Sequence, residues 1–444
     1  MIKLYNFDEL KPEEILNRDI RAEKNVEDVV DGIIADVRAR GDEALKDYAL
    51  KFDGAVIENL QVTQEEIDEA FAGMDPYFLE TLRQAAANIE NFHRQQVHKN
   101  FVVNDKPGIV LGQKYTPIEK AGVYVPGGTA AYPSTVLMDV IPAKVAGVAE
   151  IVMTTPAGKD GKVNPVILAA AATAGVTKIF KTGGAQAVAA LAYGTETIRP
   201  VAKITGPGNI FVATAKSLVS AFVGIDAVAG PTEIGIIADE TANPSLLAAD
   251  LIGQAEHDEL AGSVLFTDST EIADKVQESL KYRVPRTEHA ERVHTSLSGT
   301  QSAIVLTDGL DQSIDAANVY AAEHLEIQTK DADAVVKRIK NAGAIFRGPY
   351  SPVPLGDYMS GSNHVLPTGG TARFAAGLGV HTFMKPVEVI EYDEEGLKAL
   401  AARINAFAVS EDLPAHGECV LSRFVKDPYD KATLREQEKE AGLR

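Results

Sequence analysis

The chain has 444 residues, more than one compact core usually holds, so we expect two or more domains. Its hydrophobic fraction of 45% and charged fraction of 24% are those of an ordinary globular protein. The formal net charge of -20 argues against nucleic acid or an anionic membrane as the main partner.

The first hundred residues are predicted to be helical. The opening residues, Met1 to Asn6, lack the long apolar core of a signal peptide. Apolar residues recur at helical spacing from Glu27 to Phe52, with Gly41 as the expected break. Pro76 to His98 is a second amphipathic segment, and we expect its charged face to be solvated.

From Ala121 onward, glycine-rich turns separate short apolar strands from apolar helices. Gly147 and Gly175 each stand between a helical run and the next strand, where a helix C-cap needs a left-handed backbone. The apolar stretch from Pro165 to Val176 is too short to span a bilayer and predicts a buried helix. This alternation of strands and helices predicts a parallel sheet with helices on both faces.

A second run of the same kind begins near Glu233. The predicted strands in it are Ile234–Ala238, Ser263–Thr267, Ala303–Thr307 and Ala344–Arg347. We therefore predict an α/β protein with two doubly wound, Rossmann-like parallel-sheet domains and a helical N-terminal segment. Charged helices from about Val387 onward would form a small appended C-terminal domain.

Three glycine-rich turns belong to the first run, at Tyr124–Gly128, Lys181–Gln186 and Thr205–Asn209. Glycines at strand ends let a phosphate approach the backbone amides of the next helix. None of the turns matches the G-x-G-x-x-G fingerprint, and each taken singly is more often a plain tight turn. Three at equivalent ends of one sheet favour a nucleotide site without identifying the nucleotide.

The nine histidines fall into three groups. Four lie in polar helical segments and are interpreted as surface residues: His93, His98, His289 and His294. His381 stands in an apolar stretch and is left unassigned. The other four lie among small and polar residues, where functional roles are more common: His257, His324, His364 and His416.

Two of these histidines have neighbours that suggest a metal site. If Leu247 to His257 is helical, Gln254 and His257 share one face and can point at a single ion. Glutamine is an unusual zinc ligand, so this spacing alone does not favour a metal over a plain helix face. Asp357 is expected in an irregular stretch, with His364 soon after it.

The C-terminal region holds two further candidates. His416 lies in a charged run from Glu411 to Glu418, for which a solvated surface is the favoured interpretation. Cys419 has no base at a recognisable spacing, so an inert thiol is preferred to a nucleophile. As the single cysteine it allows no intrachain disulfide, and we expect a cytoplasmic protein.

The adjacent pair Glu323 and His324 is the sharpest acid–base candidate. It is followed directly by Leu325 to Gln328, a predicted core strand. A carboxylate and an imidazole that reach one cavity from a strand edge can act as general base and acid. A solvated pair at the strand edge is the ordinary alternative.

Several segments, in order along nearly the whole chain, resemble those of histidinol dehydrogenases. They are Gly122–Gly128, Gly183–Ala187, Gly206–Asn209, Gln254–Asp258, Glu323–Glu326 and Gly361–Gly370. The last segment, Gly-Ser-Asn-His-Val-Leu-Pro-Thr-Gly-Gly, is long and highly specific.

The resemblance implies a zinc-dependent homodimer that oxidises L-histidinol through L-histidinaldehyde to L-histidine with NAD, the last step of histidine biosynthesis. It implies one zinc ion per subunit, held by Gln254, His257, Asp357 and a His416 that the partner subunit supplies. The metal would hold the imidazole and amino nitrogens of the substrate and so position it.

The same resemblance implies roles for further residues. His324 would take the hydroxyl proton during hydride transfer, and Glu323 would activate water for attack on the aldehyde. Substrate contacts would come from Thr232, Gln254, His257, His324, Asp357, His364, Glu411 and His416. The NAD site would be lined by Tyr124, Gln186 and Asn209.

The chain departs from the family pattern in places. Thr232 stands where serine is common, and Ala322 stands where proline is frequent before Glu323. These departures put rates in doubt rather than identity. The alternatives are a related zinc enzyme acting on another alcohol such as a sulfonated diol, a non-catalytic ligand-binding protein, and a metal-dependent hydrolase.

The expected domains combine these observations. We expect an N-terminal extension at 1–22 and a discontinuous larger α/β domain at 23–120 and 233–380 with the zinc and catalytic residues. A nucleotide-binding α/β domain would be inserted at 121–232, and a dimerisation domain would follow at 381–444.

Overall fold

The structure, a computed structural model, describes residues 2–10, 24–127 and 131–443. The chain divides into two compact units. Unit 1 comprises Met1–Val97 and Pro117–Phe383, and unit 2 comprises His98–Thr116 and Met384–Arg444. Within the described ranges, no helix is both long enough and apolar enough to cross a membrane.

Unit 1 contains a five-stranded parallel sheet with the strand order β6-β5-β4-β7-β8. Its strands are β4 (Lys120–Tyr124), β5 (Glu150–Thr155), β6 (Lys178–Lys181), β7 (Lys203–Thr205) and β8 (Gly224–Ile225). The chain starts at the central β4, adds β5 and β6 on one side, and then adds β7 and β8 on the other. The reversal between β4 and β7 is the place where open α/β sheets bind ligands, outside the carboxyl ends of the strands.

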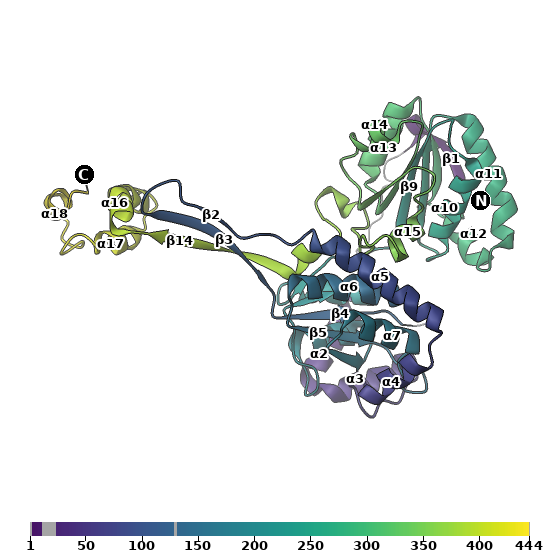
Figure 1. Cartoon of the computed structure of the whole chain (residues 1–444), viewed down its shortest axis with the longest axis horizontal. Coiled ribbons are helices and arrows are strands. Elements are labelled where there is room, and N and C mark those ends of the chain that lie inside the picture. The colour runs from purple at the N-terminus through teal and green to yellow at the C-terminus, as the bar shows by residue number, and fades with distance from the viewer. Residues whose placement is uncertain (1, 11–23, 128–130, 444) are drawn as a thin grey trace. The chain divides into compact units, whose positions relative to one another are not determined.

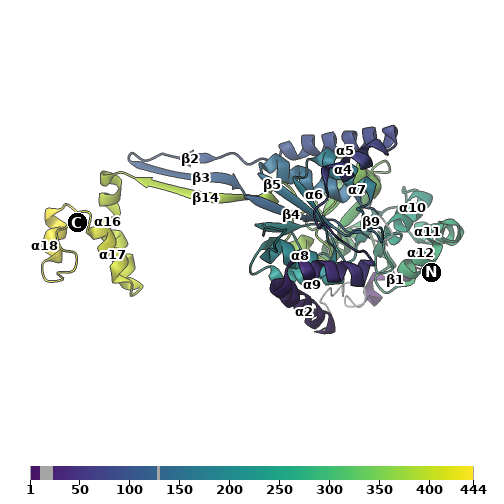
Figure 2. The ribbon, with the colours of Figure 1, turned by 90° about the horizontal axis from the view of Figure 1, so that it is seen from below.

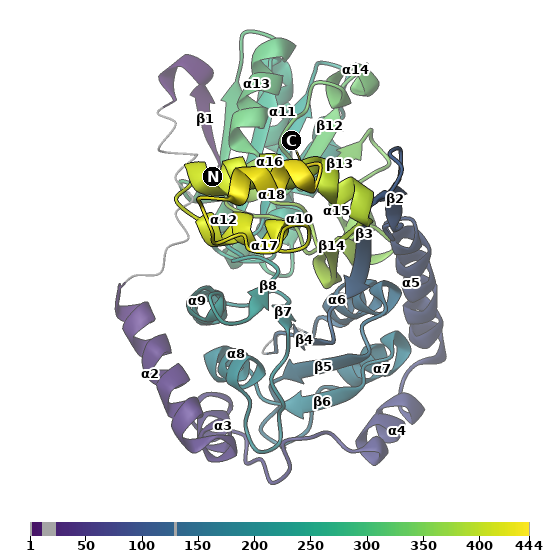
Figure 3. The same ribbon diagram turned by 90° about the vertical axis from the view of Figure 1, so that its left-hand side faces the viewer.

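Helices cover both faces of this sheet, as the alternating pattern predicts. Figure 3 shows α6 (Pro133–Ala146) and α7 (Pro165–Ala174) on one face, and α8 (Gly184–Tyr193) and α9 (Ile210–Val219) on the other. Gly147 and Gly175 end α6 and α7 with φ angles of 90° and 91°. Both glycines therefore form the predicted left-handed C-caps.

The N-terminal helices pack on this same domain. They are α2 (Lys24–Arg40), α3 (Asp42–Tyr48), the π-helical turn η2 (Ala49–Asp53), α4 (Gln64–Ala72) and α5 (Pro76–Arg94). Helix α2 packs against α8 and α9, α4 against α7, and α5 against α6 and α7. This differs from the expected grouping of 23–120 with 233–380. An apolar stripe predicts that a helix buries one face, but it does not specify which sheet receives that face.

The second sheet of unit 1 has six parallel strands in the order β1-β11-β10-β9-β12-β13. They are β1 (Lys3–Asn6), β9 (Glu233–Ala238), β10 (Gly262–Thr267), β11 (Ala303–Leu306), β12 (His324–Gln328) and β13 (Ala344–Arg347). The predicted strands of the second run are confirmed to within a residue or so. Residues 1–22 were expected to form an N-terminal extension, but β1 within this range is the edge strand of the sheet, beside β11. Residues 11–22 of the expected extension lie outside the described part of the chain.

Helices also cover both faces of the six-stranded sheet (Figure 1). On one side lie α10 (Pro244–Ala255), α11 (Thr270–Arg283) and α12 (Ala290–Ser298), and on the other α13 (Leu310–Tyr320) and α14 (Ala332–Val336). The helix α15 (Val353–Tyr358) follows β13, and four short 3-10 turns are η1 (Phe7–Glu9), η3 (Val284–Arg286), η4 (Thr371–Arg373) and η5 (Val380–Phe383). The strand order again reverses, here between β9 and β12.

Unit 2 joins two distant parts of the chain. Its three-stranded sheet has the order β14-β3-β2, with β2 (Phe101–Val103), β3 (Ile109–Pro117) and β14 (Met384–Tyr392) side by side (Figure 2). Its helices are α16 (Glu394–Ser410), α17 (Pro414–Leu421) and α18 (Leu434–Glu440). A C-terminal unit is thus present, but it also takes in residues 98–116, which were expected in the larger domain. Local periodicity carries no information about pairing between segments so far apart.

Candidate active site

The predicted acid–base pair lies at the amino end of β12. His324 is the first residue of that strand and pairs in register with Ile234 of β9. Just before the pair, Ala321 ends α13 with a left-handed φ of 52°, an uncommon conformation for a residue with a side chain. Glu323 and His324 are both buried, with 6% and 4% of their surface exposed, so the solvated alternative is wrong.

The hydrogen bonding of His324 assigns its tautomer. Nδ1 lies 3.1 Å from the backbone carbonyl oxygen of Glu233, which can only accept, so Nδ1 carries the proton. Nε2 is buried with no hydrogen-bond partner among the described residues, and it lies 3.9 Å from Oδ1 of Asp357. Burial lowers the pKa of His324. The side chain is therefore a neutral imidazole with a free lone pair on Nε2.

Glu323 is held by two donors. Its Oε2 accepts hydrogen bonds from Oγ1 of Thr232 at 2.5 Å and from the backbone amide of Glu233 at 3.0 Å. Burial raises the pKa of Glu323 to about 7, although both hydrogen bonds act to lower it. A carboxyl group with such a pKa exchanges its proton near neutral pH.

Gln254 is connected to the same network. Its Nε2 donates to Oγ1 of Thr232 at 2.6 Å, which leaves Oε1 as the side-chain atom available to a cation. Helix α10 ends at Ala255, two residues earlier than expected, but the amide of His257 still donates to the carbonyl of Gln254 at 3.3 Å. Both residues thus stay on the turn that closes α10.

Asp357 lies in the short helix α15 rather than in the irregular stretch that the sequence predicts. The carboxyl is largely buried, and burial raises its pKa to about 6. Asp357 and His257 line one cavity of about 820 Å³. Helices that belong to both sheets of unit 1 contribute to its wall, namely α5, α6, α10, α12 and α15.

The donor chemistry of the predicted ligands in unit 1 is compatible with a metal ion. Gln254, His257 and Asp357 offer an amide oxygen, an imidazole nitrogen and a carboxylate. Across the described ranges, no group of three or more His, Cys, Asp or Glu side chains is placed to hold a metal. Of the predicted ligand set, unit 1 contributes only two such residues, because Gln254 is an amide and His416 belongs to unit 2.

The other histidines are placed as follows. His364 has Nδ1 3.2 Å from the carbonyl oxygen of Asp357 and Nε2 3.5 Å from Oγ1 of Thr135, and burial lowers its pKa to about 4. His289 is exposed as predicted, but it also lines the 820 Å³ cavity, a position that no local pattern indicated. The surface interpretation of His93 is wrong, because its side chain is fully buried in α5.

Two further predicted residues lie in unit 2. Glu411 ends α16 and His416 lies in the first turn of α17. Both side chains are exposed in this chain. Their predicted roles toward substrate and zinc therefore depend on a contact beyond unit 2 itself.

The three glycine-rich turns follow the carboxyl ends of β4, β6 and β7, as expected. The hydroxyl oxygen of Tyr124 accepts a hydrogen bond from the amide of Gly184 at 3.1 Å. A Cβ atom on Gly206 would lie 2.0 Å from the carbonyl oxygen of Tyr124, so the close approach of these turns requires glycine there. Gly128 of the first turn lies outside the described residues.

The remaining predicted nucleotide residues lie at helix starts. Asn209 caps α9 by accepting hydrogen bonds from the amides of Phe211 and Val212 at 3.1 and 3.2 Å. Gln186 lies in the first turn of α8 with its Oε1 buried and without a partner among the described residues. An unpartnered buried amide oxygen marks a place where a ligand could donate a hydrogen bond.

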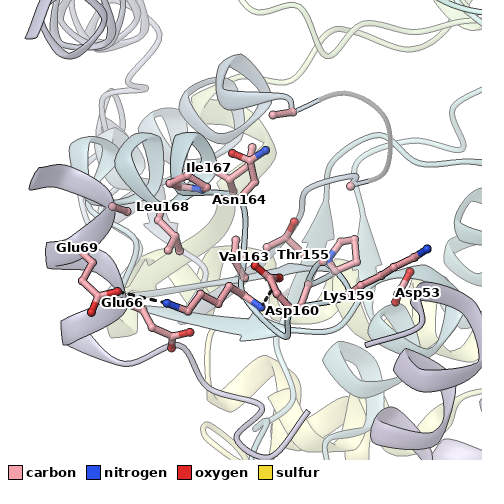
Figure 4. A pocket seen from close by; sticks show the side chains of 18 of the residues that line it. Asp53, Glu66, Glu69, Thr155, Lys159, Asp160, Val163, Asn164, Ile167 and Leu168 are labelled. Atoms are coloured by element: carbon pink, nitrogen blue, oxygen red, sulfur yellow. Dashed lines mark hydrogen bonds and ion pairs between the residues drawn. The ribbon is translucent and has the colours of Figure 1, made fainter. Parts of the chain in front are cut away.

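A second cavity, of about 850 Å³, opens at the carboxyl ends of β4 and β5. Figure 4 shows charged side chains around it, among them Asp53, Glu66 and Lys159. Tyr124, Gln186 and Asn209 are not among its lining residues. Sequence analysis missed this wall, because it combines the loop after β5 with η2 and α4, which are distant in sequence.

Comparisons with known proteins identify the family of this chain. The family model for histidinol dehydrogenase matches residues 16–424. The histidinol dehydrogenase of Bifidobacterium longum is 72% identical over 429 residues, covering 94% of this chain and 91% of that protein. The one from Corynebacterium diphtheriae is 49% identical over 405 residues, covering 89% and 90%.

A solved structure is similar over its whole length. The crystal structure of histidinol dehydrogenase from Elizabethkingia anophelis has a TM-score of 0.90 at 34% identity, covering 95% of this chain and 98% of that one. On the family model, the relatives and the shared fold, the chain belongs to the histidinol dehydrogenase family of oxidoreductases.

Proposed function

We propose that this chain is a zinc-dependent, NAD-linked dehydrogenase that oxidises L-histidinol through L-histidinaldehyde to L-histidine, the last step of histidine biosynthesis. One observation carries the proposal: a buried imidazole with a free Nε2 adjoins a buried carboxyl whose pKa is about 7. Oxidation of an alcohol to an acid needs two proton acceptors, one for the hydroxyl group and one for the attacking water.

His324 would act in the first oxidation. Its free Nε2 takes the hydroxyl proton while the carbon-bound hydride leaves for NAD, which serves as the electron acceptor. Nδ1 keeps its proton and goes on donating it to the carbonyl oxygen of Glu233, so the ring keeps its orientation as it becomes charged. The carboxylate of Asp357, 3.9 Å from Nε2, lies where it stabilises that charge.

Glu323 would act between the two oxidations. As a carboxylate it takes a proton from the water that attacks the aldehyde carbon, and a pKa of about 7 suits a base at neutral pH. In the second oxidation, once His324 has released the first proton to solvent, the hydrate loses a hydroxyl proton to His324 and a hydride to a second NAD. Thr232 holds Glu323 in place with the 2.5 Å hydrogen bond, and the threonine hydroxyl does this as a serine hydroxyl would.

Gln254, His257, Asp357 and His416 of the partner subunit would hold the zinc ion. Bound zinc supplies a fixed point for the amino and imidazole nitrogens of the substrate. His257 and Asp357 line the 820 Å³ cavity. Nε2 of Gln254 donates to Thr232, which leaves Oε1 of Gln254 for the metal. His364 and Glu411 would contact the substrate.

NAD would bind at the carboxyl ends of the five-stranded sheet. The reversal between β4 and β7, the glycine turns and the unpartnered Oε1 of Gln186 support this position. Tyr124, Gln186 and Asn209 would contact the nucleotide. The neighbouring cavity, at about 850 Å³, falls within the size range of cofactor pockets, roughly 300–1,000 Å³.

A homodimer with a shared active site is supported by unit 2. The buried apolar core of this unit is small, consisting of Ala401, Leu421 and Val425 with partly buried neighbours. Large apolar side chains remain exposed, among them Phe407 at 72% and Ile390 at 71%. Such exposure on a small unit is typical of a surface that another chain covers.

A substrate comparison tests the proposal. The purified zinc-loaded protein should reduce NAD with L-histidinol and show negligible turnover with sulfonated diols. The reverse preference would identify a related alcohol dehydrogenase instead. Histidinol binding without NADH formation would indicate a ligand-binding protein.

A further inference from the structure

Glu326 lies at the centre of β12 and has no exposed surface. Its carboxylate accepts hydrogen bonds from the backbone amide of Val353 at 3.3 Å and from Nε2 of Gln328 at 3.3 Å. Val353 is the first residue of α15. Because side chains alternate along a strand, Glu326 and His324 project from the same face of β12.

Glu326 also hydrogen-bonds to Asp250 of α10. Two carboxyl groups can form such a bond only if one of them carries a proton. Burial and the neighbouring carboxyl raise the pKa of Glu326 well above its usual range, and burial raises that of Asp250 to about 6. A protonated carboxyl in this pair is thus favoured in the folded protein.

The three elements that meet at Glu326 each carry a residue of the proposed active site. Helix α10 presents Gln254 one turn after Asp250. Helix α15 presents Asp357 one turn after Val353. Strand β12 presents His324 two residues before Glu326. A single buried side chain thus connects the supports of two proposed zinc ligands and the proposed base.

We infer that Glu326, through its hydrogen bonds to Asp250 and Val353, is the positioning residue that keeps Gln254, Asp357 and His324 in mutual register. The inference rests on the proposed function for the roles of those three residues. Residues that orient metal ligands typically change metal affinity or activity by about 10–100-fold when removed. Glu326 touches neither substrate nor cofactor in this role.

Substitution of both carboxyls tests the inference. In Glu326→Gln, Oε1 still accepts from Val353 and Nε2 donates to Asp250; only the bond from Gln328, within β12 itself, is lost. Zinc affinity and kcat should therefore stay close to those of the unaltered protein. Glu326→Ala also removes the bonds to Val353 and Asp250, and it should lower zinc affinity and kcat by about 10–100-fold. Asp250→Asn and Asp250→Ala should repeat this contrast, and the double alanine variant should be no worse than the more impaired single one.

Ser263→Ala provides a matched control. The Ser263 hydroxyl makes a buried hydrogen bond to the carbonyl of Leu251, so it also supports α10, but it does so from β10, which pairs with β9 and β11. This variant should keep zinc affinity near normal. Equal loss in Ser263→Ala and Asp250→Ala would mean that general loosening of α10 is responsible, and it would overturn the inference.

Other outcomes for these variants also test the role of Glu326. A folded Glu326→Gln as impaired as Glu326→Ala overturns the inference, and so does a fully active Asp250→Ala. If Glu326→Ala does not fold, the Asp250 pair makes the same comparison with β12 intact. Zinc affinity is measured by competition with a chelator and needs no turnover. Failure of the proposed function would appear separately, as absence of histidinol-dependent NADH in the unaltered protein.

Discussion

The Nδ1 atom of His324 donates a hydrogen bond to the backbone carbonyl of Glu233, 3.1 Å away, at the amino ends of neighbouring strands β12 and β9. Open α/β sheets usually bind ligands at the carboxyl ends of their strands. The six-stranded sheet instead places its candidate site at the opposite edge, where α10, α15 and β12 converge. The five-stranded sheet keeps the usual arrangement for the proposed nucleotide.

The first prediction separates the base from a metal ligand. His324→Asn should lower kcat by about 10²–10⁴-fold, because the general base is lost, while zinc content stays near normal. His257→Asn should lose zinc and substrate binding together. Metal analysis of both purified variants, beside steady-state kinetics, makes the comparison. Equal zinc loss in the two would contradict the separation of roles.

Glu323 should act only after the aldehyde has formed. In Glu323→Gln the first oxidation should continue while the overall reaction falls, so the NADH released per histidinol consumed should drop toward one. In the unaltered enzyme, a carboxylate base with a pKa of about 7 predicts a kcat for aldehyde oxidation that rises as pH increases through about 7. This limb of the pH–rate profile should vanish in Glu323→Gln, and its persistence would exclude Glu323 as its source.

The sequence predicted much of the fold because its signals are local. Gly147 and Gly175 end helices where predicted, and the strands of the second run follow from short apolar stretches. The pairing of β2 and β3 with β14, and the docking of α2 on α8, depend on tertiary contacts that no local pattern encodes.

The candidate site divides in the same way. Glu323 and His324 are adjacent in the chain, so the sequence alone predicts them as an acid–base pair. The structure shows in addition that both are buried and that Nε2 of His324 has no hydrogen-bond partner among the described residues. The network from Gln254 through Thr232 to Glu323 joins three separate segments and could be seen only in three dimensions. Asp357 lies in a helix that the sequence did not predict, because it contains Pro354 and Gly356, and both residue types disfavour helix interiors.

A buried acid outside the active site provides a test on stability. Asp139 of α6 is fully buried, and burial together with the nearby Asp226 raises its pKa to about 8. The folded state therefore binds a proton that the unfolded state releases above pH 3.8, so stability falls as pH rises from about 4 toward 8. The loss is on the order of 4 kcal/mol at pH 7.

Asp139→Asn removes this dependence. Relative to the unaltered protein, the variant should gain more in Tm at pH 8 than at pH 5, whatever constant cost the amide adds. Thermal unfolding of both proteins across this range measures the effect. A Tm difference that does not change with pH would show that the pKa of Asp139 in the folded state is not raised above its value in the unfolded state.

The shared active site predicts complementation. His324→Asn and His416→Asn should each be inactive alone, because one lacks the base and the other a zinc ligand. In a mixed dimer, one of the two sites combines the unaltered His324 of one subunit with the unaltered His416 of the other. Random mixing of equal amounts of the two variants should therefore recover up to about a quarter of full activity. Activity that stays at the level of the separate variants, despite subunit exchange shown by mass, would argue against sharing.

The most direct test of the central claim counts reducing equivalents. With limiting L-histidinol and excess NAD, the account predicts two NADH formed per histidinol consumed and L-histidine as the product. A ratio of one with accumulating aldehyde would contradict the assignment of Glu323 and His324 to a double oxidation.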